Sequence, residues 1–217
     1  MCVNAGYAQN VIAIASSHFA SAEKQFRYPL EYGNQRPVAS TWTVTGAGAY
    51  IVGDKPLDKK KCVLIKGITT GKIVDYGVKD SMNMGACMAP AAAELIEANF
   101  KDLDVDKDYY DAIFTGDLGE IGNRILSELL KEKGIDIADK LYDCGMLIYE
   151  GETKCSGGSG CGCSASVLSA YYLPKIISGE WKKVLFVPTG ALLSTVSYNE
   201  GKNVPGIAHG VMLEYVP

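Results

Sequence analysis

Two cysteines in the stretch GGSGCGCSASVLSAYYLPKI, residues 157–176, are the first candidates for chemistry in this sequence. Cys161 and Cys163 follow a run of glycines and serines, at the point where an apolar helical pattern begins. A thiolate there could be a nucleophile or a metal ligand, because a helix N-terminus lowers the pKa of a thiol. The third interpretation is a small apolar side chain, packed where two backbone segments cross closely. Only the first interpretation makes the chain an enzyme.

The cysteine spacing argues against a structural zinc site. Such sites usually carry paired C-x2–4-C motifs, whereas this chain has a single C-x-C with Cys144 and Cys155 at a distance. We therefore expect no metal and no other cofactor. The small-residue interpretation is favoured for Cys62, Cys87 and Cys144. It extends to the C-x-C pair, which we expect to shape a pocket and not to catalyse.

A histidine and a short basic and aromatic segment form a second group of candidates. The apolar run NVIAIASSH is typical of a buried parallel strand, and it ends at Ser17 and His18. Ligands of open α/β sheets gather at the carboxyl ends of strands. In the AEKQFRY segment that follows, Arg27 could hold a carboxylate bidentately beside Lys24, and Tyr28 could stack on an aromatic ring. The alternative is a surface loop that contacts a neighbouring subunit.

Acidic residues and a second histidine complete the candidates. Asp117 and Glu120 stand where a helix is predicted to begin, and capping of that helix is their favoured interpretation. His209 lies in a closing strand, where it either lines a pocket or hydrogen-bonds a neighbouring loop. The glycine-rich stretches TGAGAY and GGSGCG lack the spacing of phosphate-binding loops, so they give little support to a nucleotide site.

The composition sets limits on the class of protein. With 47% hydrophobic and 21% charged residues, the 217-residue chain reads as one globular domain, with approximate halves at residues 1–105 and 106–217. A formal net charge of −4 argues against a general nucleic-acid binder. No apolar run approaches the roughly 20 residues that cross a bilayer, and no basic signal-peptide region opens the chain. An odd count of seven cysteines suits a reducing compartment, so we predict a soluble, intracellular protein.

Strands and helices alternate along the chain. TWTVTGAGAYIV predicts a strand interrupted by small residues, and KKCVLIKGITTGKIVDYG predicts two strands joined by Thr-Thr-Gly. A helix is expected over 88–100, with Pro90 in its first turn. The strand YYDAIFTGD leads into the amphipathic helix LGEIGNRILSELLKEKG, which Gly134 ends.

The remaining elements are KLYDCGMLIYE as a strand, a helix over about 164–177, and the closing strands KKVLFVPTGALLS and IAHGVMLEYV. The alternation predicts a mostly parallel sheet covered by helices on both faces. A buried strand so close to the first residue usually has partners, and we expect the chain to be part of a longer protein.

Seven segments together carry a resemblance to a known family. They are SSHFASAEKQFRYPLEYG, TVTGAGAYIV, MGACMAPAAAELI, FTGDLGEIGNRIL, DCGMLIY, GGSGCGCSA and PTGALLS with IAHGVMLE. In this order they closely resemble the stage V sporulation protein AD family, members of the thiolase-like superfamily from endospore-forming bacteria. The resemblance implies a thiolase-like α/β fold with α/β/α/β/α layers, here lacking its N-terminal part, because family members are longer.

The resemblance also implies that the synthase partners of a catalytic cysteine are absent. GCGCSAS is similar to the ketoacyl-synthase stretch G-N-T-S-A-A-S, which puts Cys161 at the asparagine position. TGDLG is similar to P-H-Q-A-N, which puts Gly116 at the histidine position. A thiol cannot copy the amide N–H, so we expect no catalytic residue in this chain.

The family role implied is binding of dipicolinic acid and its uptake into the developing spore, beside stage V sporulation membrane proteins at the inner membrane of the forespore. A homodimer is implied as well, because the strand around VIAIAS commonly pairs across the two-fold axis of thiolase-like dimers. An acyl-transferring condensing enzyme and a structural subunit with a vestigial pocket are the alternatives. The expected ligand-binding residues are Ser17, His18, Lys24, Arg27, Tyr28, Asp117, Cys161, Cys163 and His209.

Overall fold

A five-stranded sheet lies at the centre of the computed structural model, which describes residues 1–26, 36–56, 61–152 and 155–217, and only the backbone of residues 23–26. Strands β8, β5 and β6 run parallel to one another, whereas β11 runs antiparallel to both β8 and β4. Four of the five strands therefore point the same way, as the predicted α/β class requires. In order across the sheet they are β4 (Cys62–Thr69), β11 (Gly210–Val216), β8 (Lys183–Val187), β5 (Ala112–Thr115) and β6 (Leu141–Asp143).

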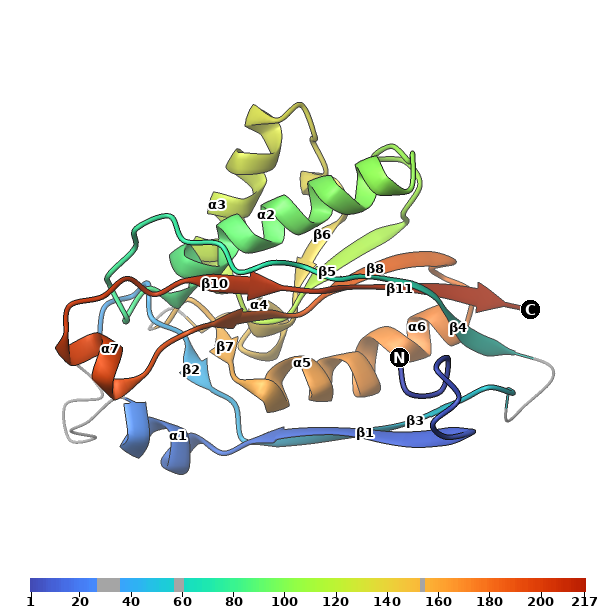
Figure 1. The fold of residues 1–217 in the computed structure, drawn as a ribbon, viewed down its shortest axis with the longest axis horizontal. Helices are drawn as coiled ribbons and strands as arrows, with labels where there is room; N and C mark the ends of the chain where they lie inside the picture. Colours follow the sequence, from blue (N-terminus) through green and yellow to red (C-terminus); the bar gives the residue numbers. More distant parts are fainter. Residues whose placement is uncertain (27–35, 57–60, 153–154) are drawn as a thin grey trace.

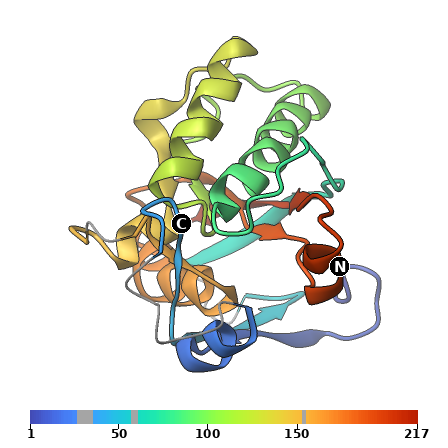
Figure 2. The same cartoon turned by 90° about the vertical axis from the view of Figure 1, so that its left-hand side faces the viewer.

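Helices cover both faces of this sheet (Figure 1). On one face α2 (Met84–Asp102) and α3 (Gly119–Glu132) lie side by side, as Figure 2 shows, and they share an apolar core with the sheet. On the other face lie α5 (Cys161–Val167), a π-helical turn (Leu168–Tyr172) and α6 (Leu173–Ile177). They pack on a second apolar core that contains Phe114 stacked on Tyr172.

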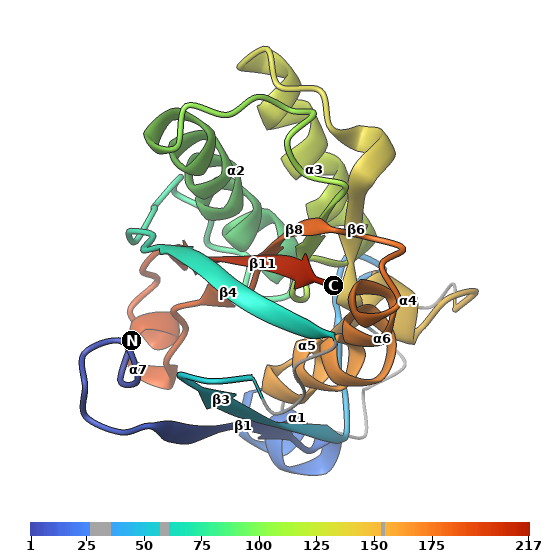
Figure 3. The same ribbon diagram turned by 90° about the vertical axis from the view of Figure 1, so that its right-hand side faces the viewer.

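A separate antiparallel pair of strands, β1 (Asn10–Ser17) and β3 (Gly46–Gly53), packs against the far side of α5 (Figure 3). The described layers are thus β/α/β/α, four of the five that were expected. The prediction of a buried parallel strand over β1 was wrong, because α5 covers only one face of the pair. The side chains of Ile12, Ile14 and Ile51 on the outer face are 67%, 71% and 63% exposed.

Short elements complete the described chain. They bring the ends of distant segments together beside the N-termini of α2 and α5, at one end of the layers (Figure 1). The short strand β2 (Trp42–Thr43) pairs in parallel with β7 (Gly158–Ser159), and β9 (Thr189–Ala191) pairs antiparallel with β10 (Gly206–Ala208). The others are the helices α1 (Phe19–Phe26), α4 (Cys144–Ile148) and α7 (Thr195–Asn199), and a 3-10 turn (Ala138–Lys140).

Three local predictions were wrong in part. The segment after β4 forms no second strand, only a bridge between Val74 and Gly206. The expected strand KLYDCGMLIYE ends after three residues, because the Asp143 side chain accepts a hydrogen bond from the Met146 N–H and starts α4. Pro90 is the seventh residue of α2, since that helix begins at Met84. Across the described residues no helix has both the length and the apolar composition of a membrane span.

Candidate functional site

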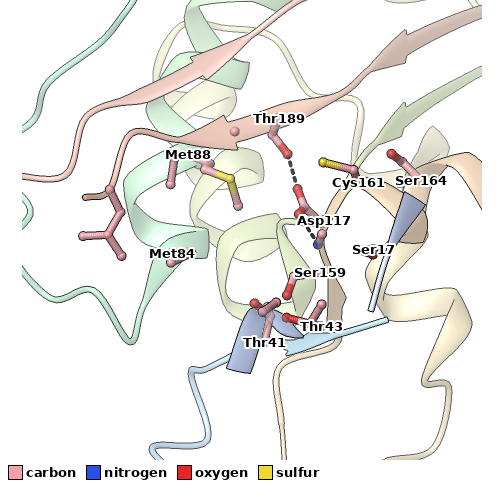
Figure 4. Close-up of a pocket in the computed structure, with 15 residues that line it drawn as sticks. Ser17, Thr41, Thr43, Met84, Met88, Asp117, Ser159, Cys161, Ser164 and Thr189 are labelled. Atoms are coloured by element: carbon pink, nitrogen blue, oxygen red, sulfur yellow. Dashed lines mark hydrogen bonds between the residues drawn. The ribbon is translucent and has the colours of Figure 1, made fainter. Parts of the chain in front are cut away.

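A cavity of about 370 Å³ lies where Ser17 at the end of β1, Thr43 at the end of β2 and the loop after β5 meet the start of α2 and strand β9. Met84 and Met88 of α2 form an apolar part of the cavity wall, as Figure 4 shows. Cys161 lies on the opposite side of the lining residues. Most of the polar side chains that line the cavity carry hydroxyl groups. These belong to Ser17, Thr41, Thr43, Ser159, Ser164 and Thr189.

Among the described residues of this wall, Asp117 is the charged one (Figure 4). It follows β5, at the carboxyl end of a parallel strand, which is where ligands of open α/β sheets gather. Its Oδ1 accepts a hydrogen bond from Thr189 Oγ1 at 2.9 Å, and its Oδ2 accepts one from the Gly160 N–H at 3.0 Å. Burial raises the pKa of Asp117 to about 6, and the nearby Asp143 acts in the same direction.

The loop before α5 is held against this carboxyl by close backbone approach. Gly160 has φ +94°, and a Cβ there would lie 3.0 Å from Ser17 Oγ. Ser17 Oγ in turn donates to the Val44 carbonyl at 2.7 Å and accepts from the Gly162 N–H at 2.9 Å. The glycine run seen in the sequence therefore serves to bring β1, Asp117 and the start of α5 together. Ser17 lines the cavity, but its hydroxyl is largely committed to these backbone bonds.

Asp117 does not cap α3, which corrects the favoured interpretation. The residue that precedes the helix is Leu118, and no side chain at that position bonds the helix. Two of the free N–H groups are satisfied by Asp143 instead: its carboxylate accepts from Leu118 N at 2.9 Å and from Gly119 N at 3.1 Å. The next two, of Glu120 and Ile121, donate to the carbonyl and the hydroxyl of Ser156. Glu120 is exposed. Because the capping residue comes from β6, Asp117 is left to face the cavity.

The two cysteines of the C-x-C motif have different surroundings. Cys161 is exposed and lines the cavity. Cys163 is buried behind it, with its Sγ 3.8 Å from the Gly116 carbonyl, and burial raises the pKa of this thiol well above its usual value. A reactive thiolate at Cys163 is therefore not supported, and the small-residue interpretation agrees with the structure. Cys87 and Cys144 are likewise buried, and Cys62 is half-buried.

The other predicted ligand residues lie in several places. His18 follows β1 directly but is exposed and is not among the residues that line the cavity. His209, between β10 and β11, is exposed, and its Nδ1 accepts a hydrogen bond from the Gly71 N–H at 3.2 Å. Of its two interpretations the loop contact is the one that forms. Lys24 belongs to α1, whose Ala22 lines the cavity, and Arg27 and Tyr28 lie outside the described residues.

Sequence reasoning missed most of the hydroxyl wall and both methionines. Thr41 and Thr43 flank Trp42 in TWT, and Thr189 follows Pro188 in PTG, so a weak signal existed in threonines placed at strand ends. Met84 and Met88 are four residues apart, which puts them on one face of α2. That spacing is also what a helix needs for ordinary core packing, and the sequence alone could not separate the two roles.

The synthase-like histidine position, Gly116, leaves little room for a side chain. A Cβ there would lie 3.2 Å from the Thr189 N and 3.3 Å from the Pro188 Cα, so a histidine would require a small shift at the start of strand β9. Among the residues that the structure describes, no group of three histidine, cysteine or acidic side chains is placed to hold a metal ion.

Comparison with solved structures shows the thiolase-like fold of condensing enzymes. The tetronic acid condensing enzyme AbyA1 matches with a TM-score of 0.54 and 15% identity, over 98% of this chain and 62% of that enzyme. The 3-oxoacyl-[acyl-carrier-protein] synthase III of Aquifex aeolicus VF5 matches with a TM-score of 0.52 and 15% identity, over 98% and 60% of the two chains. The fold class predicted from the sequence is confirmed.

Sequence comparison identifies the family more narrowly. A curated relative, Stage V sporulation protein AD of Bacillus subtilis (strain 168), is 45% identical over 213 residues. That match covers 98% of this chain and 62% of the relative, so the chain spans less than two thirds of the relative's length. The family model for Stage V sporulation protein AD matches residues 1–214. The chain belongs to the Stage V sporulation protein AD family.

Proposed function

We propose that the cavity beside Asp117 binds dipicolinic acid, and that the protein takes part in the uptake of this acid into the developing spore without catalysing acyl transfer. The observation that carries the proposal is the cavity itself, at strand ends of a thiolase-like fold in a sporulation protein family. Dipicolinic acid is a flat pyridine ring with two carboxyl groups, so its site needs an apolar wall and several hydrogen-bond donors.

The wall of the cavity offers both kinds of contact. Met84 and Met88 supply a polarizable apolar surface of the kind that packs well on an aromatic ring. The hydroxyl group of Ser164 can donate a hydrogen bond to a carboxylate oxygen. The volume of about 370 Å³ lies at the lower end of the range for small-molecule sites, which suits a ligand with a single ring.

The absence of catalysis is proposed from the residues at the two synthase-like positions. Gly116 has no side chain to move a proton, and the thiol of Cys161 is a poor hydrogen-bond donor for a developing oxyanion. The fold itself favours the alternative, an acyl-transferring condensing enzyme. Incubation with acetyl and malonyl thioesters separates the two: we expect no stoichiometric acyl adduct on any cysteine of the chain by mass spectrometry, whereas such an adduct would support the enzyme.

The binding proposal is tested by calorimetric titration with dipicolinate, using benzene-1,3-dicarboxylate as a matched ligand that lacks the ring nitrogen. Ala191, on β9, lines the cavity, and Ala191→Tyr should fill it and weaken binding at least 10-fold. Ala47→Tyr places the same side chain on the exposed outer face of β3 and should bind as the unaltered chain does. If the two variants bind dipicolinate with equal affinity, then the ligand does not bind in this cavity.

We further propose that the protein works as a homodimer beside stage V sporulation membrane proteins at the inner membrane of the forespore. The exposed isoleucines of β1 support the dimer, because an apolar strand with an open edge favours pairing with another chain. Light scattering tests it: Ile14→Lys should convert a dimer to a monomer, and a monomeric unaltered chain would contradict the proposal.

A further inference from the structure

The charge of the cavity conflicts with a ligand that carries two carboxylates. Asp117 is the charged residue among the fifteen that line the cavity, and no lysine, arginine or histidine of the described chain is among them. An ionised Asp117 would repel a carboxylate at hydrogen-bond distance, and the repulsion grows as the ligand displaces water from the cavity. The proposed ligand and the observed wall are compatible once this charge is removed.

A proton on Asp117 removes the charge and supplies a donor. Each carboxyl oxygen already accepts one hydrogen bond, from Thr189 Oγ1 or from the Gly160 N–H, and each keeps a further acceptor position. A proton on one of these positions turns the carboxyl group into an O–H donor. Bonds between such a donor and a carboxylate are short and strong, because the acceptor is charged.

The surroundings of Asp117 favour this proton. Asp143 of β6 acts with burial to raise the pKa of Asp117. Burial also raises the pKa of the Cys144 and Cys163 thiols, so they stay neutral and supply no positive charge that would hold Asp117 ionised, and Cys161 of α5 shares the cavity. Burial already raises the pKa of Asp117 to about 6, so a small further rise in this pKa is enough for protonation near neutral pH. A bound dicarboxylate adds negative charge beside Asp117 and so raises its pKa further.

We infer that the cavity takes up its dicarboxylate ligand together with one proton, held on Asp117. The inference rests on the proposed function and specifies its pH dependence. The proton comes from solvent and returns to solvent when the ligand leaves, so release is favoured on the more alkaline side.

Calorimetry on the 217-residue chain measures the proton directly. Titration of dipicolinate at pH 7.5, in buffers of different ionisation enthalpy, should show uptake of close to one proton per ligand bound. For a group with a pKa of about 6, the dissociation constant should rise about 8-fold between pH 6.5 and 7.5. The carboxyl groups of the ligand are ionised throughout this interval, so they do not contribute. EDTA in all buffers keeps divalent cations out of the measurement.

Two variants assign the proton to its residue. Asp117→Asn keeps an acceptor for the Gly160 N–H and offers the ligand an N–H donor, so it should bind with an affinity nearly independent of pH and without proton uptake. Glu94→Gln changes an acidic residue that pairs with Lys72 outside the cavity, and it should retain both the proton uptake and the pH dependence.

The outcomes separate this inference from the proposed function. Binding that is independent of pH and takes up no proton would overturn the inference alone; strong salt dependence would then assign the neutralising charge to a cationic residue such as Arg27. Binding that appears only when a divalent cation replaces EDTA would also overturn it. No binding between pH 5.5 and 8 would overturn both.

Discussion

Two aspartates at the ends of neighbouring strands, Asp117 after β5 and Asp143 at the end of β6, have different relations to their surroundings. Asp143 is 3% exposed and accepts hydrogen bonds from four groups: Thr115 Oγ1, Leu118 N, Gly119 N and Met146 N. Asp117 accepts from two, Thr189 Oγ1 and Gly160 N, and turns its remaining positions toward the cavity. Burial raises the pKa of both carboxyl groups, but Asp117 stays half-buried at the cavity wall whereas Asp143 is buried.

The number and kind of donors is what distinguishes a structural carboxylate from one available to a ligand. At Asp143 three of the four donors are backbone N–H groups, which cannot turn away or accept. They fix the start of α3 to the start of α4. At Asp117 one of the two donors is a hydroxyl, which can rotate, and the rest of the carboxyl faces the cavity. Asp143 therefore holds the loop in which Asp117 is placed.

The largest effect that tests this comparison is expected from Asp143→Asn. Whichever way the amide is placed, its NH₂ group meets a backbone N–H that needs an acceptor. A buried donor left without a partner costs about 1–3 kcal/mol, and the loss of charge weakens the other bonds. We expect a loss of about 3 kcal/mol in the free energy of unfolding, measured by urea denaturation.

The control for this substitution is Asp139→Asn, in the exposed 3-10 turn that precedes β6. Surface substitutions of this kind change stability by less than about 0.5 kcal/mol. If the two variants unfold at the same urea concentration, then Asp143 is not the residue that ties α3 to α4.

The sequence predicted the local parts of this arrangement well. The helix α3, its stop at Gly134 (φ +79°) and the strand β5 before it follow from short-range patterns of apolar and turn residues. Asp117 was placed among the ligand candidates, next to the synthase-like histidine position at Gly116, although capping was its favoured interpretation. What sequence could not show was that Asp143, some 25 residues away, supplies the cap that Asp117 was expected to provide.

The exposed strand was mispredicted for a similar reason. Ile12, Ile14 and the residues between them are apolar on both faces, and such a run is typical of a strand buried on both sides. The sequence of a strand does not show whether other elements cover both of its faces. In the described residues α5 covers the inner face of β1 and β3, and the outer isoleucines are exposed. The cavity wall was missed likewise, since Thr41, Met88 and Thr189 meet only through the fold.

A smaller effect of opposite sign is expected from Asp117→Asn. Folding raises the pKa of Asp117 from 3.8 to about 6, so the folded protein binds the proton more tightly than the unfolded chain does. Stability from this group is therefore present below about pH 4 and is lost as the pH rises to about 6. A shift of this size corresponds to about 3 kcal/mol, and solvent at the half-buried side chain reduces it. At pH 7.5 the substitution should therefore remove a destabilising charge and gain about 2 kcal/mol, which is about 4–8 °C in Tm.

Thermal unfolding followed from pH 4 to pH 8 measures this difference. The difference in Tm between the variant and the unaltered chain should grow between about pH 4 and 6 and stay constant at higher pH. A variant that is less stable at pH 7.5 would mean that Asp117, like Asp143, is held chiefly by its donors, and the comparison of the two aspartates would fail.

The smallest effect is expected from Thr189→Val, which removes the rotatable donor at Asp117 and keeps the shape of the side chain. The hydroxyl stabilises the ionised carboxylate, so its loss should raise the pKa of Asp117 further above about 6. A hydrogen bond worth about 1 kcal/mol corresponds to somewhat less than one pH unit. Carbon-13 NMR of the Asp117 carboxyl group, titrated in both proteins, measures the change. Thr195→Val, at the start of α7 and outside the cavity wall, is the matched control and should leave the titration unaltered. An unchanged midpoint in Thr189→Val would show that the Gly160 N–H alone holds the carboxylate, and that the backbone governs Asp117 as it governs Asp143.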